Sequence, residues 1–234
     1  MPLSVDEKLS ATEFAASLAA TRIFGLTTLV TAQENDLEFQ IFSERTQRTI
    51  PWSELSKQLT KQAKRHIRDQ IDKEIMRREC LEELPRLSRH RGTLVTGTLC
   101  EQYDNGTWTV LISLDDGVAD IEQRYAEYPL KFQPDKEKSG YLKGQQHVFL
   151  ITSVLPVSFY GGWTKNLILL SKRAKNLPIL LARSIDYEAT TKAKLRVIKR
   201  IPGYMTELQA QKALPRKLVA ALAQMLNEKI IFRK

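Results

Sequence analysis

The chain has 234 residues, of which 42% are apolar and 27% charged, so it can bury one or two ordinary cores without disulfides. No apolar run approaches the roughly 20 residues that a membrane-spanning helix requires, and the first residues do not resemble a secretory signal. The two cysteines, Cys80 and Cys100, cannot form a disulfide framework, which is typical of a reducing compartment. We therefore expect a cytoplasmic protein with no membrane contact.

The formal net charge of +9 is concentrated in the C-terminal part of the chain. Residues 140–234 carry 17 basic and 4 acidic side chains, whereas residues 1–56 carry 4 basic and 8 acidic ones, so their net charges are +13 and −4. A concentrated positive charge raises the affinity for polyanions, because each phosphate contact releases counterions. The distribution indicates a nucleic-acid partner for the C-terminal part, and the alternative is a merely solvated basic face.

The first half of the chain predicts a helix, a hairpin and a long helix. In residues 1–50, a helix begins after Ser4 and ends at Gly25, and the strand-like runs 26–30 and 37–42 follow it. The apolar face of this helix is expected to contain Leu9, Phe14, Leu18 and Ile23, together with the alanines between them. In residues 51–91, apolar residues recur every four positions and predict one connector helix from Ser53 to Pro85, whose other face is basic.

The second half predicts a β-barrel and a small α+β module. In residues 92–171, strands are expected at 93–99, 108–114, 118–121, 147–155 and 166–170. Five short strands favour an OB-fold barrel, which is a common oligonucleotide platform. In residues 172–234, the order is a helix near 177–183, strands 194–201 and 204–209, a helix to 226 and a strand at 228–232. The expected fold class is therefore α+β and multidomain.

This order of elements, together with several local strings, resembles the bacterial transcription elongation factor NusA in a shortened form. The strings are FAASLAAT at 14–21 with FQIF at 39–42, LTKQAKRHIR at 59–68, GTLVTGTL at 92–99, LILLSK at 167–172, KRIPG at 199–203 and NEKI at 227–230. The resemblance implies a polymerase-binding N-terminal domain, a connector helix, an OB-fold of the ribosomal S-one type and a first KH module. It also implies RNA polymerase as a partner, with effects on pausing, termination or antitermination.

The chain departs from this family at the loop that grips nucleic acid. A KH module normally holds the backbone with a G-x-x-G loop between two helices. The corresponding positions are Lys212, Ala213, Leu214 and Pro215, without a glycine, and the helix before them is missing. The family's second KH module is missing as well. The RNA grip of this module is therefore expected to be weak, remodelled onto basic side chains, or lost.

The candidate RNA-binding residues are aromatic side chains for base stacking and cations for phosphates. On the barrel they are Trp108, Lys131, Phe132 and Lys143, and core packing is the alternative role for Trp108. The C-terminal set is Lys165, Lys172, Arg173, Lys175, Lys192, Lys194, Arg196, Lys199 and Arg200. Three of these, Lys192, Lys194 and Arg196, are expected to form a cationic ridge on one face of a strand, and the alternative is a solvated edge that prevents aggregation.

The hairpin is the candidate protein-binding element. Phe39 and Phe42 are three positions apart, so they should face opposite sides of the sheet. One should pack on the first helix, while the other is free for a partner.

Enzyme motifs are missing from the sequence. Neither a nucleophile elbow, a Walker loop, a zincin motif nor a dinucleotide fingerprint occurs, and the three histidines are isolated. We expect no catalytic residues, no metal and no cofactor. The favoured hypothesis is a non-enzymatic transcription factor that binds single-stranded RNA, and the alternatives are a ribosome- or RNA-decay-associated module and a structural adaptor without RNA binding.

Overall fold

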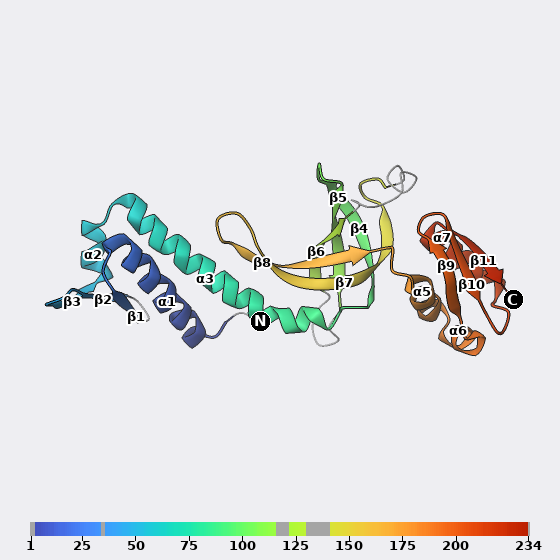
Figure 1. Cartoon of the computed structure of the whole chain (residues 1–234), viewed down its shortest axis with the longest axis horizontal. Helices are drawn as coiled ribbons and strands as arrows, with labels where there is room; N and C mark the ends of the chain where they lie inside the picture. Colours follow the sequence, from blue (N-terminus) through green and yellow to red (C-terminus); the bar gives the residue numbers. More distant parts are fainter. Residues whose placement is uncertain (1–2, 34–35, 116–121, 130–140, 234) are drawn as a thin grey trace. The chain divides into compact units, whose positions relative to one another are not determined.

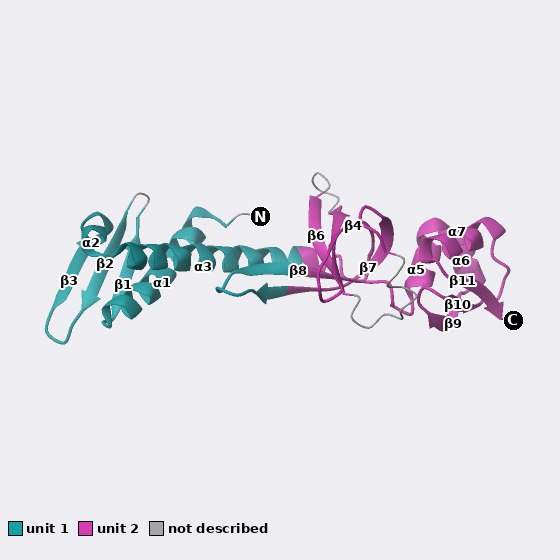
Figure 2. Cartoon of the chain, turned by 90° about the horizontal axis from the view of Figure 1, so that it is seen from above, with its two compact units in different colours: residues 1–86, 156–166 teal, residues 87–155, 167–234 magenta. Residues whose placement is uncertain are grey.

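The computed structural model describes residues 3–33, 36–115, 122–129 and 141–233, and the chain divides into two compact units (Figures 1 and 2). One unit contains residues 1–86 and 156–166, and the other contains residues 87–155 and 167–234. The helices are α1 (Val5–Phe24), α2 (Trp52–Gln58), α3 (Lys61–Ser88), α5 (Leu177–Ile185), α6 (Tyr187–Ala193) and α7 (Arg216–Leu226). The strands are β1 (Thr28–Ala32), β2 (Leu37–Phe42), β3 (Gln47–Pro51), β4 (Leu94–Gln102), β5 (Thr107–Leu114), β6 (Glu122–Pro129), β7 (Gln146–Ser158), β8 (Thr164–Ser171), β9 (Arg196–Ile201), β10 (Met205–Gln209) and β11 (Lys229–Arg233). The predicted mixed α+β class is confirmed.

None of the helices in the described ranges combines the length and the apolar character needed to cross a membrane.

Helix α1 has the predicted ends and buries part of the predicted face. Ser4 and Glu7 form a reciprocal capping box at its start, and Gly25 ends it in the left-handed conformation with a φ of 66°. The predicted apolar face is wrong in part, because Phe14 and Leu18 are 51% and 47% exposed. The alanines of the predicted face are confirmed, because Ala11, Ala15, Ala16, Ala19 and Ala20 are its buried residues. These small side chains let the helix approach the sheet closely.

Helix α1 also covers one edge strand, β1, of the N-terminal sheet, whose strand order is β1-β2-β3. Three side chains on α1, spaced four residues apart, accept hydrogen bonds from alternate N–H groups of β1. The pairs are Ala32 N to Glu13 Oε1 (2.9 Å), Val30 N to Ser17 Oγ (2.8 Å) and Thr28 N to Thr21 Oγ1 (3.0 Å). An unpaired strand edge invites pairing with another chain, so these contacts leave β1 a poor template for aggregation.

The prediction of one connector helix from Ser53 to Pro85 is wrong in two places: the helix is interrupted near its start, and it continues past Pro85. The chain is extended at Leu59, which separates α2 from α3, and the side chain of Thr60 accepts a hydrogen bond from the N–H of Ala63 at the start of α3. A threonine that caps a helix start competes with a continuous helix at that position. At the other end, Pro85 does not terminate α3, because it lies in the last turn, which extends to Ser88. The 28 residues of α3 still form about 7 to 8 turns.

The described strands of residues 92–171 form a closed barrel in the order β4-β5-β6-β8-β7. Strand β4 pairs antiparallel with both β5 and β7, and β6 pairs in parallel with β8. Four of the five predicted strands are confirmed, but the third is β6 at Glu122–Pro129, and residues 118–121 lie outside the described residues. In β6 only Ala126 and Tyr128 are buried, and the strand begins with the polar residues Glu122, Gln123 and Arg124, so the sequence resembles a polar insert.

His147 on β7 titrates in a mostly aromatic environment. Its ring centroid lies 5.0 Å from that of Tyr141 and 6.1 Å from that of Phe149, and its Nε2 lies 3.3 Å from Gln145 Oε1. Burial, with a smaller contribution from the positive charge of Lys172, lowers the pKa of His147 to about 4. The folded chain therefore favours the neutral imidazole.

Acid is expected to destabilise the fold through this histidine. The unfolded chain, in which a histidine titrates near pH 6.5, takes up this proton more readily than the folded chain between pH 6.5 and about 4. The free energy of unfolding should fall as pH decreases through this range, by up to about 3 kcal/mol from His147 alone. Urea denaturation of the wild type and of His147→Gln at pH 7, 5.5 and 4 measures this contribution. An equal loss in both proteins would contradict the prediction.

The C-terminal module confirms the predicted order of helix, two strands, helix and strand, and adds the helix α6. Its sheet has the order β11-β10-β9, in which β10 is antiparallel to β9 and parallel to β11. Helices α5 and α7 pack on one face through Leu177, Leu181, Leu218, Leu222 and Leu226. Residues 210–215, which connect β10 to α7, contain no helix.

Candidate nucleic-acid interface

A groove lies beside the connection between β10 and α7, at residues 210–214, which contains no glycine. It has a volume of about 690 Å³ and is lined by residues 210–214, by one side of α7 and by strand β11. Its apolar lining includes Leu214, Val219, Ala220, Ile230 and Phe232. This volume is in the range of pockets that hold a ligand of a few rings.

The charged residues that line this groove are all basic. They are Lys212, Arg216 and Arg233, and each of the three is exposed. Arg233 also donates a hydrogen bond to Glu207 at 3.2 Å, and its side chain remains 63% exposed. An apolar floor with a cationic rim suits a ligand that has flat bases and phosphates.

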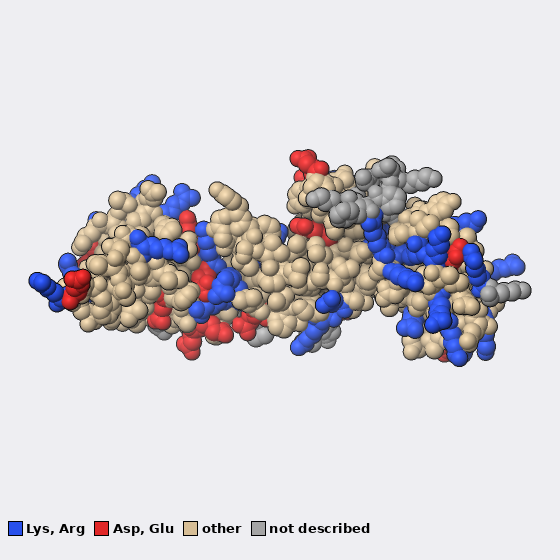
Figure 3. Space-filling model, in the orientation of Figure 1, with Lys and Arg blue, Asp and Glu red and all other residues tan. Residues whose placement is uncertain are grey.

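The carboxylates of the last part of this module, residues 194–233, are buried. Residues 194–233 contain nine Lys or Arg and two acidic residues, Glu207 and Glu228. Both glutamates are buried, at 7% and 4% exposure. The exposed charges of this segment are therefore all positive, and Figure 3 shows Lys and Arg side chains gathered on the C-terminal end.

A second cationic surface lies on the open face of the sheet. The buried Thr206 and Leu208 of β10 face the helices, so alternation places Met205, Glu207 and Gln209 on the opposite face. The strand register puts four exposed cations beside them on the same face: Arg196, Lys199, Lys229 and Arg233. These cations lie around Glu207, which is the one carboxylate in strands β9, β10 and β11.

Two of the predicted RNA-binding cations are wrong, because they are buried. Arg200 forms an ion pair with Glu228, with a distance of 2.7 Å between Nη2 and Oε1, and their side chains are 2% and 0% exposed. Lys172 is 4% exposed, and its Nζ lies 5.3 Å from the centroid of the Tyr141 ring. Both side chains are therefore withdrawn from the surface at which a phosphate would bind.

The prediction that Lys192, Lys194 and Arg196 form a cationic ridge on one strand is also wrong. Lys192 lies in α6 and pairs with Glu188 at 2.9 Å, and Lys194 is the left-handed C-cap of that helix. Only Arg196 belongs to β9. The three remain exposed, together with Lys143, Lys165, Lys175 and Lys199, whereas Arg173 is half-buried.

Of the two barrel aromatics predicted for stacking, only Trp108 lies in the described residues. Trp108 is 6% exposed, so it is a core residue, and its Nε1 has no hydrogen-bond partner among the described residues. Lys131 and Phe132 lie outside the described residues. The groove residues Lys212, Arg216, Phe232 and Arg233 were not predicted as a site, although the glycine-free loop at 212–215 marked one end of it.

Comparison with protein-family models and with curated proteins finds no match for this chain. Within the described residues, no group of three or more His, Cys, Asp or Glu side chains is arranged to hold a metal ion.

Proposed function

We propose that this chain is a non-enzymatic protein that binds single-stranded RNA through its C-terminal module. The observation that carries the proposal is that residues 194–233 bury both of their carboxylates and expose only positive charge. This arrangement gives the module a field that attracts any polyanion, and the apolar groove adds a surface for bases.

In this proposal, side chains replace the missing backbone loop of a KH module. Lys212 and Arg216 lie at the start of the groove and contact phosphates, while Phe232, which is 41% exposed, stacks on a base. Lysine and arginine side chains are flexible, whereas a glycine loop fixes the backbone through N–H groups. We therefore expect weak sequence selectivity.

The strand order supports the finer assignment of the domains that the proposal uses. A five-stranded barrel with a parallel pair between its third and fifth strands is expected for an OB-fold of the ribosomal S-one type, and the α-β-β-α-β order supports a degenerate KH module. By its resemblance to NusA, we propose that the protein acts on RNA polymerase during pausing, termination or antitermination.

Two other classes of function make different predictions. A ribosome- or RNA-decay-associated module would co-purify with ribosomal proteins or nucleases after nuclease treatment of the lysate, whereas our proposal requires RNA polymerase subunits. A structural adaptor would show no salt-dependent RNA binding.

The groove is tested in the full-length protein with two kinds of variant, one that removes its positive charges and one that removes its aromatic ring. Lys212→Gln with Arg216→Gln should lower the slope of log affinity against log salt by about 1.4, since each phosphate contact contributes about 0.7. Phe232→Ala should weaken binding at every salt concentration by about 1–3 kcal/mol without changing the slope. Fluorescence anisotropy with a labelled uridine oligomer measures both quantities.

The matched control removes the same charge elsewhere. Lys57 and Lys61 are exposed on α2 and α3, and Lys57→Gln with Lys61→Gln should leave the slope unchanged. If the groove variant and this control give the same slope as the wild type, the groove is not the binding site.

A further inference from the structure

The turn between β7 and β8 carries three exposed aromatic side chains. Phe159 and Trp163 are joined across the turn by a hydrogen bond of 2.7 Å from Phe159 N to Trp163 O. Gly161 and Gly162 have φ values of 88° and 84°, which residues other than glycine rarely adopt. The turn is therefore built to project the residues around it.

This turn is held against α3 within one compact unit (Figure 2). Asn166 Nδ2 donates to Cys80 O at 2.7 Å and to Glu83 Oε2 at 3.1 Å, and its Oδ1 accepts from Cys80 Sγ. Such a two-way amide contact fixes the direction of the hairpin. The aromatic residues at its tip are thus presented on a defined support.

All three rings leave much of their surface uncovered by the rest of the protein. Tyr160 is fully exposed, at 104%, while Phe159 and Trp163 are 40% and 37% exposed. Aromatic rings supply large apolar contact areas and are usually buried or used in binding.

Each of the two half-exposed rings is accompanied by a lysine. Lys165 Nζ lies 4.5 Å from the centroid of Phe159, and Lys73 Nζ lies 5.6 Å from the centroid of Trp163. Both distances are within the range of cation–π contacts. The tip therefore combines flat apolar surfaces with two positive charges.

We propose that this tip, formed by Phe159, Tyr160, Trp163, Lys73 and Lys165, is a base-stacking site for single-stranded nucleic acid. Tyr160 provides an open ring face for a base, and the two lysines contact the adjoining phosphates. Stacking on aromatic rings accepts every base, so this site binds without sequence preference. The proposal rests on the proposed function for its ligand, but it uses none of the groove residues.

The decisive variant is Tyr160→Ala in the full-length protein, with labelled uridine oligomers as the probe. We expect affinity to fall by about 5-fold or more at every salt concentration, which is the lower limit for one stacked base, and Tyr160→Phe to restore it. RNA should also quench the fluorescence of Trp163, and this change should be lost in Trp163→Phe.

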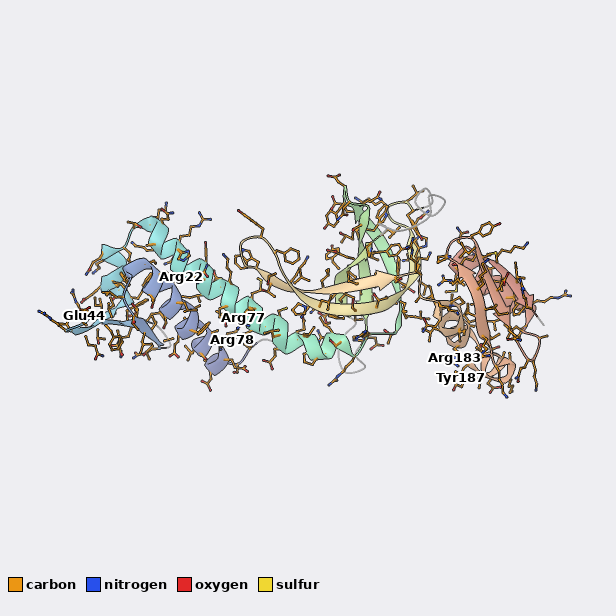
Figure 4. The ribbon with its side chains drawn as sticks, in the orientation of Figure 1. Arg22, Glu44, Arg77, Arg78, Arg183 and Tyr187 are labelled. Atoms are coloured by element: carbon orange, nitrogen blue, oxygen red, sulfur yellow. The ribbon has the colours of Figure 1, made fainter. Side chains whose placement is uncertain are left out.

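Tyr187→Ala is the matched control, because Tyr187 is also an exposed tyrosine, at 68%, and lies on α6 between Asp186 and Glu188 (Figure 4). If Tyr160→Ala binds RNA as well as Tyr187→Ala does, while the groove variants weaken binding, the stacking site is wrong and the proposed function stands. If the wild-type protein binds no RNA, both proposals are overturned. If Tyr160→Ala loses binding to a protein partner but keeps its affinity for RNA, the stacking site is also overturned.

Discussion

Replacement of Arg200 by methionine is expected to lower the free energy of unfolding by about 3–5 kcal/mol, because it leaves a buried carboxylate without its cation. The guanidinium binds Glu228 through Nε at 3.1 Å and Nη2 at 2.7 Å, and its Nη1 donates to Ala174 O at 2.6 Å. Glu228 also accepts hydrogen bonds from Gly203 N and from the hydroxyl of Thr206. The pair therefore joins the segment before α5, strands β9 and β10, and the end of α7.

The control is Lys199→Met, because Lys199 is the exposed neighbour of Arg200 on β9. We expect a change within about 0.5 kcal/mol there, as for most surface substitutions. Urea denaturation of both variants measures the difference. The double variant Arg200→Met with Glu228→Gln removes both charges and should recover part of the stability, since breaking a buried pair costs more than replacing it. Equal stability of Arg200→Met and Lys199→Met would contradict this account.

Arg200 illustrates what a count of charges along the chain leaves out. The net charge of +13 for residues 140–234 identified the basic end of the protein, but it weights Arg200 and Lys172 equally with exposed cations. Burial of a charge depends on a partner brought close by the fold, and Glu228 lies 28 positions away in the sequence. Local patterns contain no information about such a pair.

The fold was predictable wherever a local signal determined it. The ends of α1 follow from the capping box at Ser4 and the left-handed Gly25, and most barrel strands follow from alternation. The break at Leu59 and the strand β6 were missed, because a helix-capping threonine inside an apolar repeat and a strand with two buried residues give weak local signals.

The candidate site was predictable only in part. The absence of glycine at 212–215 predicted that a KH-type backbone grip is not available there. The groove, however, brings residues 210–214, α7 and β11 together, and their meeting is a tertiary property. The aromatic tip at Phe159, Tyr160 and Trp163 resembles an ordinary glycine turn in the sequence, since nothing local distinguishes an exposed ring from a buried one.

The two phenylalanines of the hairpin are expected to respond very differently to substitution. They face opposite sides of the sheet, as predicted: Phe39 is fully buried against Val30, Ile50 and Ile67, and its ring lies 5.7 Å from that of Trp52. Phe39→Ala should lower the free energy of unfolding by about 3–5 kcal/mol, the usual cost of truncating a buried phenylalanine. Phe39 is thus ruled out as a protein contact in the folded chain.

Phe42 is the member of the pair that remains for a partner. It is half-buried on the open face of the sheet, which it shares with Leu29, whose exposure is 53%. Phe42→Ala should change stability by less than about 1 kcal/mol, because a half-exposed ring leaves a smaller cavity. If the hairpin contacts RNA polymerase, as the resemblance to NusA implies, Phe42→Ala should reduce capture of purified core polymerase, while circular dichroism and the unfolding midpoint stay near the wild type. If Phe42→Ala and Leu29→Asp both capture polymerase as well as the wild type does, the polymerase contact lies elsewhere. If Phe42→Ala lowers the free energy of unfolding as much as Phe39→Ala does, both faces of the sheet are buried.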